Sequence, residues 1–136
     1  MSANNLLIES SAIDTLNYKP TILNLFYINN KYILFYNYFN NFLKTKVTFF
    51  FIINKYKQNI IAIDKIYNNA NWLERETSEM YGLNYKWKQD TRKLLLDYIK
   101  IESPLLKSFQ CEGTQDIFYN LIDNQVVVVK NEVIEL

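Results

Sequence analysis

The chain has 136 residues, the length of one domain, with 49% apolar residues, 21% charged residues and a formal net charge of +1. A chain of this size can bury its own core, and its balanced charge argues against general nucleic-acid binding, which needs a surplus of Lys and Arg. It has no His, one Cys (Cys111) and two glycines (Gly82 and Gly113). It therefore lacks the ligands for a zinc site or a four-cysteine iron–sulfur cluster, and it lacks the glycine motifs that bind nucleotides.

Neither a targeting signal nor a membrane span is apparent in the sequence. The first fourteen residues contain no basic side chain and include Glu9, and the longest clean apolar run is Val47–Ile53. That run is far shorter than the ~20 residues that cross a bilayer. Asn, Ile, Lys, Tyr and Phe are abundant, and their codons are rich in A and T. We therefore expect a protein that is not itself transmembrane and is encoded in an A/T-rich genome such as that of an organelle.

The first half of the chain alternates β-rich runs with polar turns. Leu6, Leu7, Ile13 and Leu16 recur at helical spacing and predict a short helix that ends before Pro20. Three predicted strands follow: Thr21–Ile28, Lys31–Phe39 and Thr45–Ile53. Asn29-Asn30 between the first two predicts a tight hairpin, because Asn tolerates positive φ. The run Ile60–Tyr67 is too short for periodicity to decide between strand and helix.

A helix over 72–81 has the clearest boundaries in the sequence. Asn71 followed three residues later by Glu74 predicts an N-cap with its acidic partner, and Gly82 stands where a left-handed C-terminal residue is favoured. Helical geometry places Trp72, Glu76 and Met80 on one stripe.

The C-terminal part is predicted to contain short elements. Leu83–Trp87 is strand-like, Asp90–Tyr98 predicts a short helix, and Ser103-Pro104 predicts an extended break. Asp116–Leu121 and Gln125–Ile134 predict a second hairpin joined through Asp123-Asn124. The sequence therefore predicts a single α/β (α+β) domain over residues 1–110, with a mixed sheet of three to four strands covered by helices. Residues 111–136 are predicted to form an extended C-terminal tail or hairpin.

Two hypotheses describe the charged side chains of the helix. Glu74, Arg75, Glu76 and Glu79 can form the solvated side of a surface helix, the more common arrangement. Alternatively, Glu76 is buried beside Trp72, in which case its charge must be paired. The only other arginine of the chain besides Arg75 is Arg92, so the second hypothesis predicts a Glu76–Arg92 pair or, alternatively, a bond from Glu74 or Arg75 to a group on a partner. Glu79 is expected in solvent under both hypotheses.

The residues of this region also match a known family pattern. The pattern is Glu-Arg-Glu, two free positions, an acid, two bulky apolar residues, and later a basic residue, an arginine and two aliphatics. The matching positions are Trp72, Glu74, Arg75, Glu76, Glu79, Met80, Tyr81, Gly82, Lys88, Arg92, Leu94, Leu95, Asp97, Tyr98, Pro104, Leu105, Lys107 and Phe109. This set resembles the signature of the thirty-kilodalton subunit of respiratory complex I, also called subunit nine of mitochondrial NADH dehydrogenase. Leu106, Ser108 and Gln110 depart from the family's Arg, Asp and Pro.

The resemblance implies a structural or assembly subunit in the peripheral arm of NADH:ubiquinone oxidoreductase. Such a subunit binds no cofactor itself, whereas the complex as a whole uses FMN, iron–sulfur clusters, NADH and ubiquinone. The implied partners are other peripheral-arm subunits, chiefly those of the quinone site, with the C-terminal tail packed on a partner. The implied location is the matrix side of the mitochondrial inner membrane. The N-terminus is short for the family, so a helical leader is expected to be trimmed or supplied by a neighbour.

Two other function classes remain open from the residues alone. An organellar ribosomal or RNA-associated protein could use the abundant Tyr and Phe for base stacking, although these aromatics lie in strand-like runs typical of a core. An acid–base enzyme could use Glu74, Glu76 or Glu79, although carboxylates on one helical turn are common without catalysis.

Overall fold

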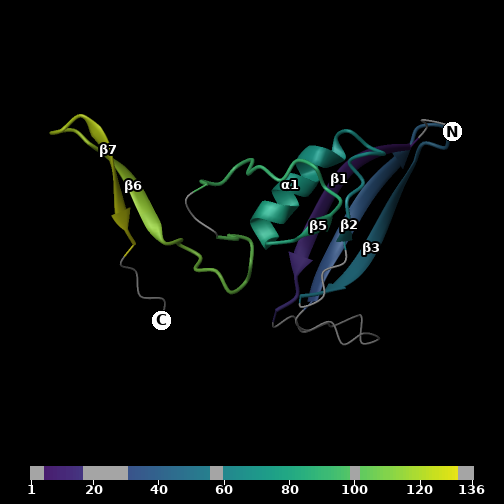
Figure 1. The fold of residues 1–136 in the computed structure, drawn as a ribbon, viewed down its shortest axis with the longest axis horizontal. Coiled ribbons are helices and arrows are strands. Elements are labelled where there is room, and N and C mark those ends of the chain that lie inside the picture. The colour runs from purple at the N-terminus through teal and green to yellow at the C-terminus, as the bar shows by residue number, and fades with distance from the viewer. Residues whose placement is uncertain (1–4, 17–30, 56–59, 99–101, 132–136) are drawn as a thin grey trace.

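The computed structural model describes residues 5–16, 31–55, 60–98 and 102–131 (Figure 1). Its elements in chain order are β1 (Asn5–Asp14), β2 (Lys31–Asn40), β3 (Thr45–Asn54), β4 (Ile60–Ile61), α1 (Ala70–Tyr81), β5 (Tyr85–Lys86), β6 (Gln115–Asn120) and β7 (Gln125–Lys130). The predicted α/β (α+β) class is confirmed. The strands at Lys31–Phe39 and Thr45–Ile53 are also confirmed, whereas Thr21–Ile28 and the Asn29-Asn30 turn lie outside the described residues.

The main sheet is antiparallel with the order β1-β2-β3. The helix predicted over 6–16 is wrong, because this segment is strand β1. A register irregularity between Leu7 and Glu9 explains the error. Because of this irregularity, the side chains of Leu7 and Ser10, three residues apart, are both buried. Burial at every second residue, as in a regular strand, begins only after the irregularity and continues at Ala12 and Asp14. A strand with such a bulge imitates the spacing of a helix.

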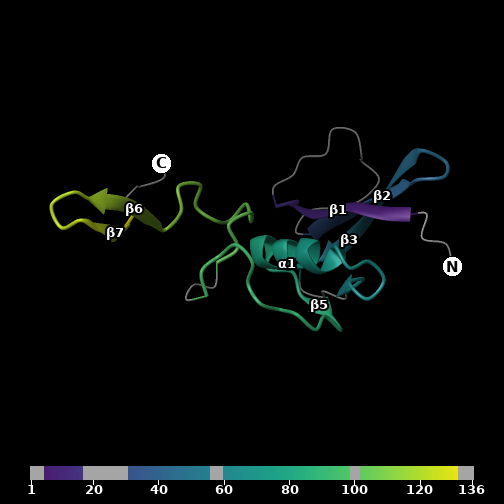
Figure 2. The same cartoon turned by 90° about the horizontal axis from the view of Figure 1, so that it is seen from above.

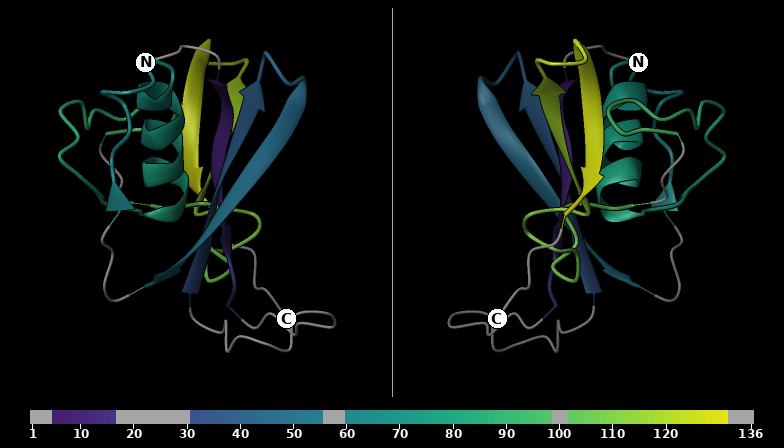
Figure 3. Two further views of the ribbon diagram at one scale, coloured as in Figure 1. Left: turned by 90° about the vertical axis from the view of Figure 1, so that its right-hand side faces the viewer. Right: turned by 90° about the vertical axis from the view of Figure 1, so that its left-hand side faces the viewer.

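The core lies between one face of this sheet and α1 (Figure 2). Leu34 of β2 and Ala12 of β1 are nearly inaccessible, and they pack in one cluster with Ala70 of α1 and with Leu83 and Tyr85 beyond the helix. Figure 3 shows α1 on the β1 side of the sheet and β3 at the opposite edge. Burial is therefore concentrated on β1 and β2, while nearly all of β3 is exposed.

The boundaries of α1 differ from the prediction at the start and agree at the end. The N-cap is Asn69 rather than Asn71, and Asn69 makes no side-chain cap. The side-chain amide of Asn69 instead donates to the Leu7 carbonyl oxygen at 2.6 Å, which connects the start of the helix to β1. The predicted role of Gly82 is confirmed, since it ends the helix with φ 66°, a left-handed conformation that glycine adopts without a Cβ penalty.

The segments around α1 are mostly irregular. Ile60–Tyr67 starts with the two residues of β4, which pair in parallel with β5, and then turns toward the helix. The helix predicted over 90–98 is wrong, since these residues form bends. The predicted C-terminal hairpin is confirmed as β6–β7, with Asn124 at positive φ in its turn, and it projects away from the sheet (Figure 1). Its second strand ends at Lys130, and the predicted positions 132–134 lie outside the described residues. No helix in the described part of the chain is long and apolar enough to cross a membrane.

Candidate functional site

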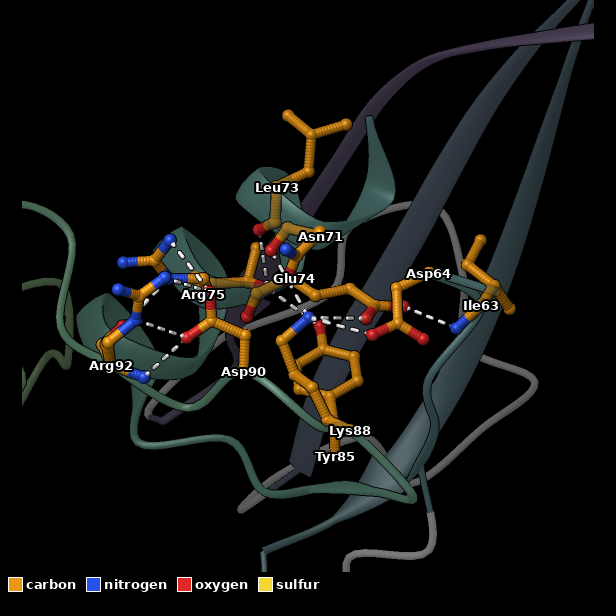
Figure 4. Close-up of polar contacts among 11 residues, drawn as sticks. Ile63, Asp64, Asn71, Leu73, Glu74, Arg75, Tyr85, Lys88, Asp90 and Arg92 are labelled. Carbon is orange, nitrogen blue, oxygen red and sulfur yellow. Dashed lines mark hydrogen bonds and ion pairs between the residues drawn. The ribbon is translucent and has the colours of Figure 1, made fainter. Parts of the chain in front are cut away.

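Glu74 is the carboxylate of the signature that α1 buries completely. It shares the inward face of the helix with Ala70 and Thr77, two residues small enough to let the helix approach the sheet closely. One carboxylate oxygen accepts from the Ile63 backbone N–H at 2.7 Å, and the other accepts from Lys88 Nζ at 3.0 Å (Figure 4). Burial raises the pKa of Glu74, against the opposing effects of the Ile63 amide and the Lys88 ammonium group.

Lys88 completes this buried pair from the segment after β5. Its side chain is only 2% exposed, and its ammonium group also donates to the Asn71 carbonyl oxygen at 3.2 Å and lies 3.8 Å from Asp64 Oδ2. A buried ion pair needs such additional hydrogen bonds to offset the loss of hydration. Three segments, namely the turn at Ile63-Asp64, the helix and the strand that precedes Lys88, therefore meet at one pair of charges (Figure 4).

A hydroxyl pair lies next to Glu74. Thr77 Oγ1 is 2.7 Å from the Tyr85 hydroxyl and also donates toward the Leu73 carbonyl oxygen, one turn earlier in the helix. Burial raises the pKa of Tyr85 well above its ordinary range, and the same holds for Tyr36 on β2. Both phenols therefore remain neutral over the physiological pH range and serve as hydrogen-bonding groups.

Arg75 binds chiefly the main chain of the following loop. Its guanidinium donates to the carbonyl oxygens of Arg92 at 2.8 Å and of Lys93 at 3.1 Å. A weaker ion pair of 3.5 Å joins Arg75 to Asp90, whose other partner is Arg92 at 2.8 Å. The hydrogen bonds from Arg92 hold the pKa of Asp90 well below its usual range.

Glu79 binds the amides of the same loop. It accepts from the backbone N–H groups of Leu94 at 2.9 Å and Leu95 at 3.0 Å, and also from that of Leu96. Burial acts to raise the pKa of Glu79, but the three amide donors outweigh it, so that the pKa lies below its ordinary value. Three amides held by one carboxylate also explain why residues 94–96 bend instead of continuing as a helix.

The structure therefore corrects three expectations for the helix. Glu76 is exposed and does not pair with Arg92, whose partner is Asp90. Trp72, on the same stripe, is also exposed, because Ala70, Glu74 and Thr77 form the inward face instead. The third correction is Glu79, which was expected in solvent and is buried.

The later signature positions fold back onto the helix and β1. The Leu105 N–H donates to the Met80 carbonyl oxygen at 3.1 Å, and the Lys107 N–H donates to Asp14 Oδ2 at 3.2 Å. Gly82 packs close to Ser103, next to Pro104, and Tyr81 is partly buried against the core. Lys93 Nζ donates to the Asp97 carbonyl oxygen and, at 3.4 Å, the Tyr98 hydroxyl donates to the Lys93 carbonyl oxygen. Phe109 donates its N–H to the Leu106 carbonyl oxygen.

We call residues 87–98 the signature loop. Its shape is set by Arg75 and Glu79, while several of its own side chains point into solvent. Trp87, Arg92, Leu95 and Tyr98 are among the exposed ones. A metal centre is not indicated, since among the described residues no three His, Cys, Asp or Glu side chains are grouped as metal ligands.

Comparisons with known proteins identify the family. Residues 2–115 match the family model described as "Respiratory-chain NADH dehydrogenase, 30 Kd subunit". The chain belongs to this family. The match ends at the first residue of β6, so the β6–β7 hairpin lies almost entirely beyond it. The RNA-associated alternative receives no support from these comparisons.

The relatives are longer than this chain. It is 38% identical over 112 residues to "NADH-ubiquinone oxidoreductase subunit 9" of Paramecium primaurelia, covering 82% of this chain and 52% of the relative. The protein of the same name from Paramecium tetraurelia is 32% identical over 136 residues, covering 98% and 64%. A bacterial relative, one of the NADH-quinone oxidoreductase subunits of Wolbachia from Brugia malayi, is 35% identical over 66 residues, 48% of this chain and 35% of that protein. The chain thus spans about half to two-thirds of the length of its Paramecium relatives.

Proposed function

We propose that this chain is a non-catalytic structural subunit in the peripheral arm of NADH:ubiquinone oxidoreductase, next to the subunits that form the quinone site. In this role it supports electron transfer from NADH to ubiquinone while FMN and the iron–sulfur clusters are held by other subunits. Family membership and the names of the relatives support the proposal. The abundance of residue types whose codons are rich in A and T supports an organelle-encoded protein. The matrix side of the mitochondrial inner membrane is the location that family membership implies.

One structural observation carries the proposal: the charged groups of the signature build a rigid surface instead of a reaction centre. Glu74 is occupied by Lys88 and an amide, Glu79 by three amides, and Arg75 by two carbonyl oxygens. All three side chains are thus engaged in contacts within this chain. Their joint effect is to fix the signature loop against α1.

The fixed loop has the composition of a protein contact. Arg, Tyr and Trp are the residue types that contribute most to binding energy at interfaces, and the signature loop exposes one of each together with Leu95. A loop already held in shape loses little conformational entropy on binding. We therefore assign the signature loop to a contact with a neighbouring subunit.

The C-terminal tail, residues 111–136, is assigned to a second contact. The β6–β7 hairpin is exposed on both faces, with Ile117, Phe118 and Val126 among its exposed apolar side chains. An isolated two-stranded hairpin is marginally stable in water. Packing of this tail on a partner subunit would supply the missing apolar cover.

Rebinding to a depleted complex tests this function. The NADH dehydrogenase is stripped of this subunit and incubated with the full chain, and the recovered complex is assayed for bound chain and for NADH:ubiquinone activity. We expect wild type to rebind and restore activity. Leu95→Asp should weaken rebinding by tenfold or more, whereas Ile66→Asp, at an exposed position of a different turn, should not. Absence of the chain from the native complex, or equal rebinding of the two variants, would refute the proposal.

A further inference from the structure

We infer that β3 is a docking edge, to which an extended segment of a neighbouring subunit adds as a further strand of the main sheet. This inference rests on the proposed function for the existence of a neighbour, but it concerns a surface separate from the signature loop. Three observations carry it: the open edge of β3, the apolar surface beside that edge, and the charge at one end of the strand.

The edge of β3 has the geometry of a strand that is normally paired. Its ten residues, Thr45–Asn54, follow β2 in continuous register with no bulge, and within the described residues β3 pairs with β2 alone. Proteins usually protect such edges with proline, bulges or several charges. This edge contains no proline and a single charged residue, Lys46. As far as the described residues show, a long, regular and apolar edge is therefore available for backbone hydrogen bonds.

Apolar side chains project from both faces of the same strand. Phe49 and Phe51 on the α1 side and Phe50 and Ile52 on the other side are all about half exposed or more. In an added strand, side chains would alternate in the same way and cover both faces at once. A helix laid on the sheet would cover one face only, so the two-sided exposure favours an extended segment.

Pockets for side chains accompany the edge on the α1 side. A groove of about 430 Å³ runs between β3 and Tyr67, with Tyr38, Phe49 and Phe51 in its lining. A second groove of about 370 Å³ continues past Phe51 toward Ile60 and Ile63. Neither lining contains a charged residue. Strand addition commonly draws affinity from backbone bonds and specificity from such pockets for alternate side chains. The alternate residues of the added segment that face α1 are therefore apolar.

The charge at the start of β3 specifies one end of the partner. Lys44 and Lys46 are exposed, and no carboxylate of the described residues lies within ion-pair distance of either. Lys44 Nζ donates to the neutral side chain of Asn41 at 3.0 Å, which leaves its charge uncompensated. Opposite charges across a strand pair are stabilising. The occupant is thus an apolar strand that carries Asp or Glu where it passes Lys44 and Lys46.

Backbone amide exchange tests the pairing directly. Exchange is measured by mass spectrometry on the full chain alone and in the assembled NADH dehydrogenase, with α1 as the internal reference. Alternate amides of 45–54, those that point away from β2, should exchange at least 100-fold more slowly in the complex, whereas the amides of α1 should change little. Equal exchange of β3 in a complex that contains the chain would overturn the pairing of β3 and leave the proposed function intact. Absence of the chain from the complex would overturn the proposed function.

A charge-reversal variant tests the partner's chemistry. Lys46→Glu should weaken rebinding to the depleted complex by tenfold or more, whereas Lys65→Glu, an exposed lysine that lines neither groove, should rebind as wild type does. Equal rebinding of the two variants would overturn the acidic partner. Protection of β3 that appears in the free chain and grows with its concentration would assign the edge to a second copy and overturn the inference. If the side chains of Phe49 and Phe51 are covered in the complex but the β3 amides are not protected from exchange, the inference of strand addition would also be overturned.

Discussion

Removal of the Lys88 ammonium group tests whether the buried pair with Glu74 stabilises the fold. In Lys88→Met the carboxylate keeps its hydrogen bond from the Ile63 amide but loses its counter-charge at 3.0 Å. Because Glu74 is fully buried and Lys88 is 2% exposed, water cannot replace the lost partner without opening the helix. Breaking a buried pair in this way typically costs ~3–5 kcal/mol. Single domains have ~5–15 kcal/mol in total, so the loss should be large.

The double variant Glu74→Gln/Lys88→Met separates the cost of an unpaired charge from the cost of changed side-chain packing. The glutamine side chain would be neutral and would still accept from the Ile63 amide, so we expect the double variant to recover at least about 1 kcal/mol relative to Lys88→Met, by analogy with other buried pairs. The measurement is urea unfolding of the full chain followed by far-ultraviolet circular dichroism. A loss below about 1 kcal/mol in Lys88→Met, or no recovery in the double variant, would refute this account of the pair.

The pH dependence gives an independent readout of the same pair. Burial raises the pKa of Glu74 above its value in the unfolded chain, against the Lys88 ammonium group, which lowers it. Between these two pKa values the folded state binds more protons, so the contribution of Glu74 to the free energy of unfolding falls as pH rises. Lys88→Met should extend this decline to higher pH, because the opposing cation is gone. Glu74→Gln should remove this pH-dependent contribution to the free energy of unfolding.

Three further predictions concern single features of the fold. Glu79→Ala should cost about 1–3 kcal/mol in urea unfolding because three amides lose their acceptor, whereas the exposed control Glu76→Ala should cost less than about 0.5 kcal/mol. Since the pKa of Glu79 is lowered, its contribution is complete above the ordinary carboxyl pKa and should be lost as pH falls through the folded value. Gly82→Ala should cost about 1 kcal/mol, because the positive φ disfavours a Cβ and that atom would lie 3.1 Å from Ser103 Oγ. At concentrations well above those of the unfolding measurements, the isolated full chain should aggregate through apolar patches beyond the few hundred Å² usual for monomers, and a chain that stays monodisperse there in light scattering would contradict this expectation.

The sequence predicted the elements that depend on local chemistry. The strands at Lys31–Phe39 and Thr45–Ile53 followed from β-branched and aromatic runs, and the end of α1 followed from Gly82. The first strand was mistaken for a helix because a bulge is a property of strand pairing, which one strand's sequence does not contain. The bends at 94–96 were mistaken for a helix because their amides are bound by Glu79, which is fifteen residues or more away.

The inward face of α1 was misassigned because Trp72 was given more weight than the small residues. Ala70, Thr77 and Tyr81 mark a stripe at helical spacing, and Glu74 lies on it. Trp72 lies off that stripe, two residues after Ala70, and therefore faces solvent. The combination of that stripe with a lysine beyond the next strand is the signal that could have identified the Glu74–Lys88 pair.

The signature residues hold the neighbouring segments mainly through main-chain groups. Arg75 and Glu79 bind carbonyl oxygens and amides of the signature loop, and the downstream segment is held through the N–H groups of Leu105 and Lys107. Main-chain groups are the same for every residue except proline. The departures from the family pattern at Leu106, Ser108 and Gln110 therefore leave these contacts unchanged. The exposed side chains of Trp87, Leu95 and Tyr98 are therefore available to contact the neighbouring subunit that we propose.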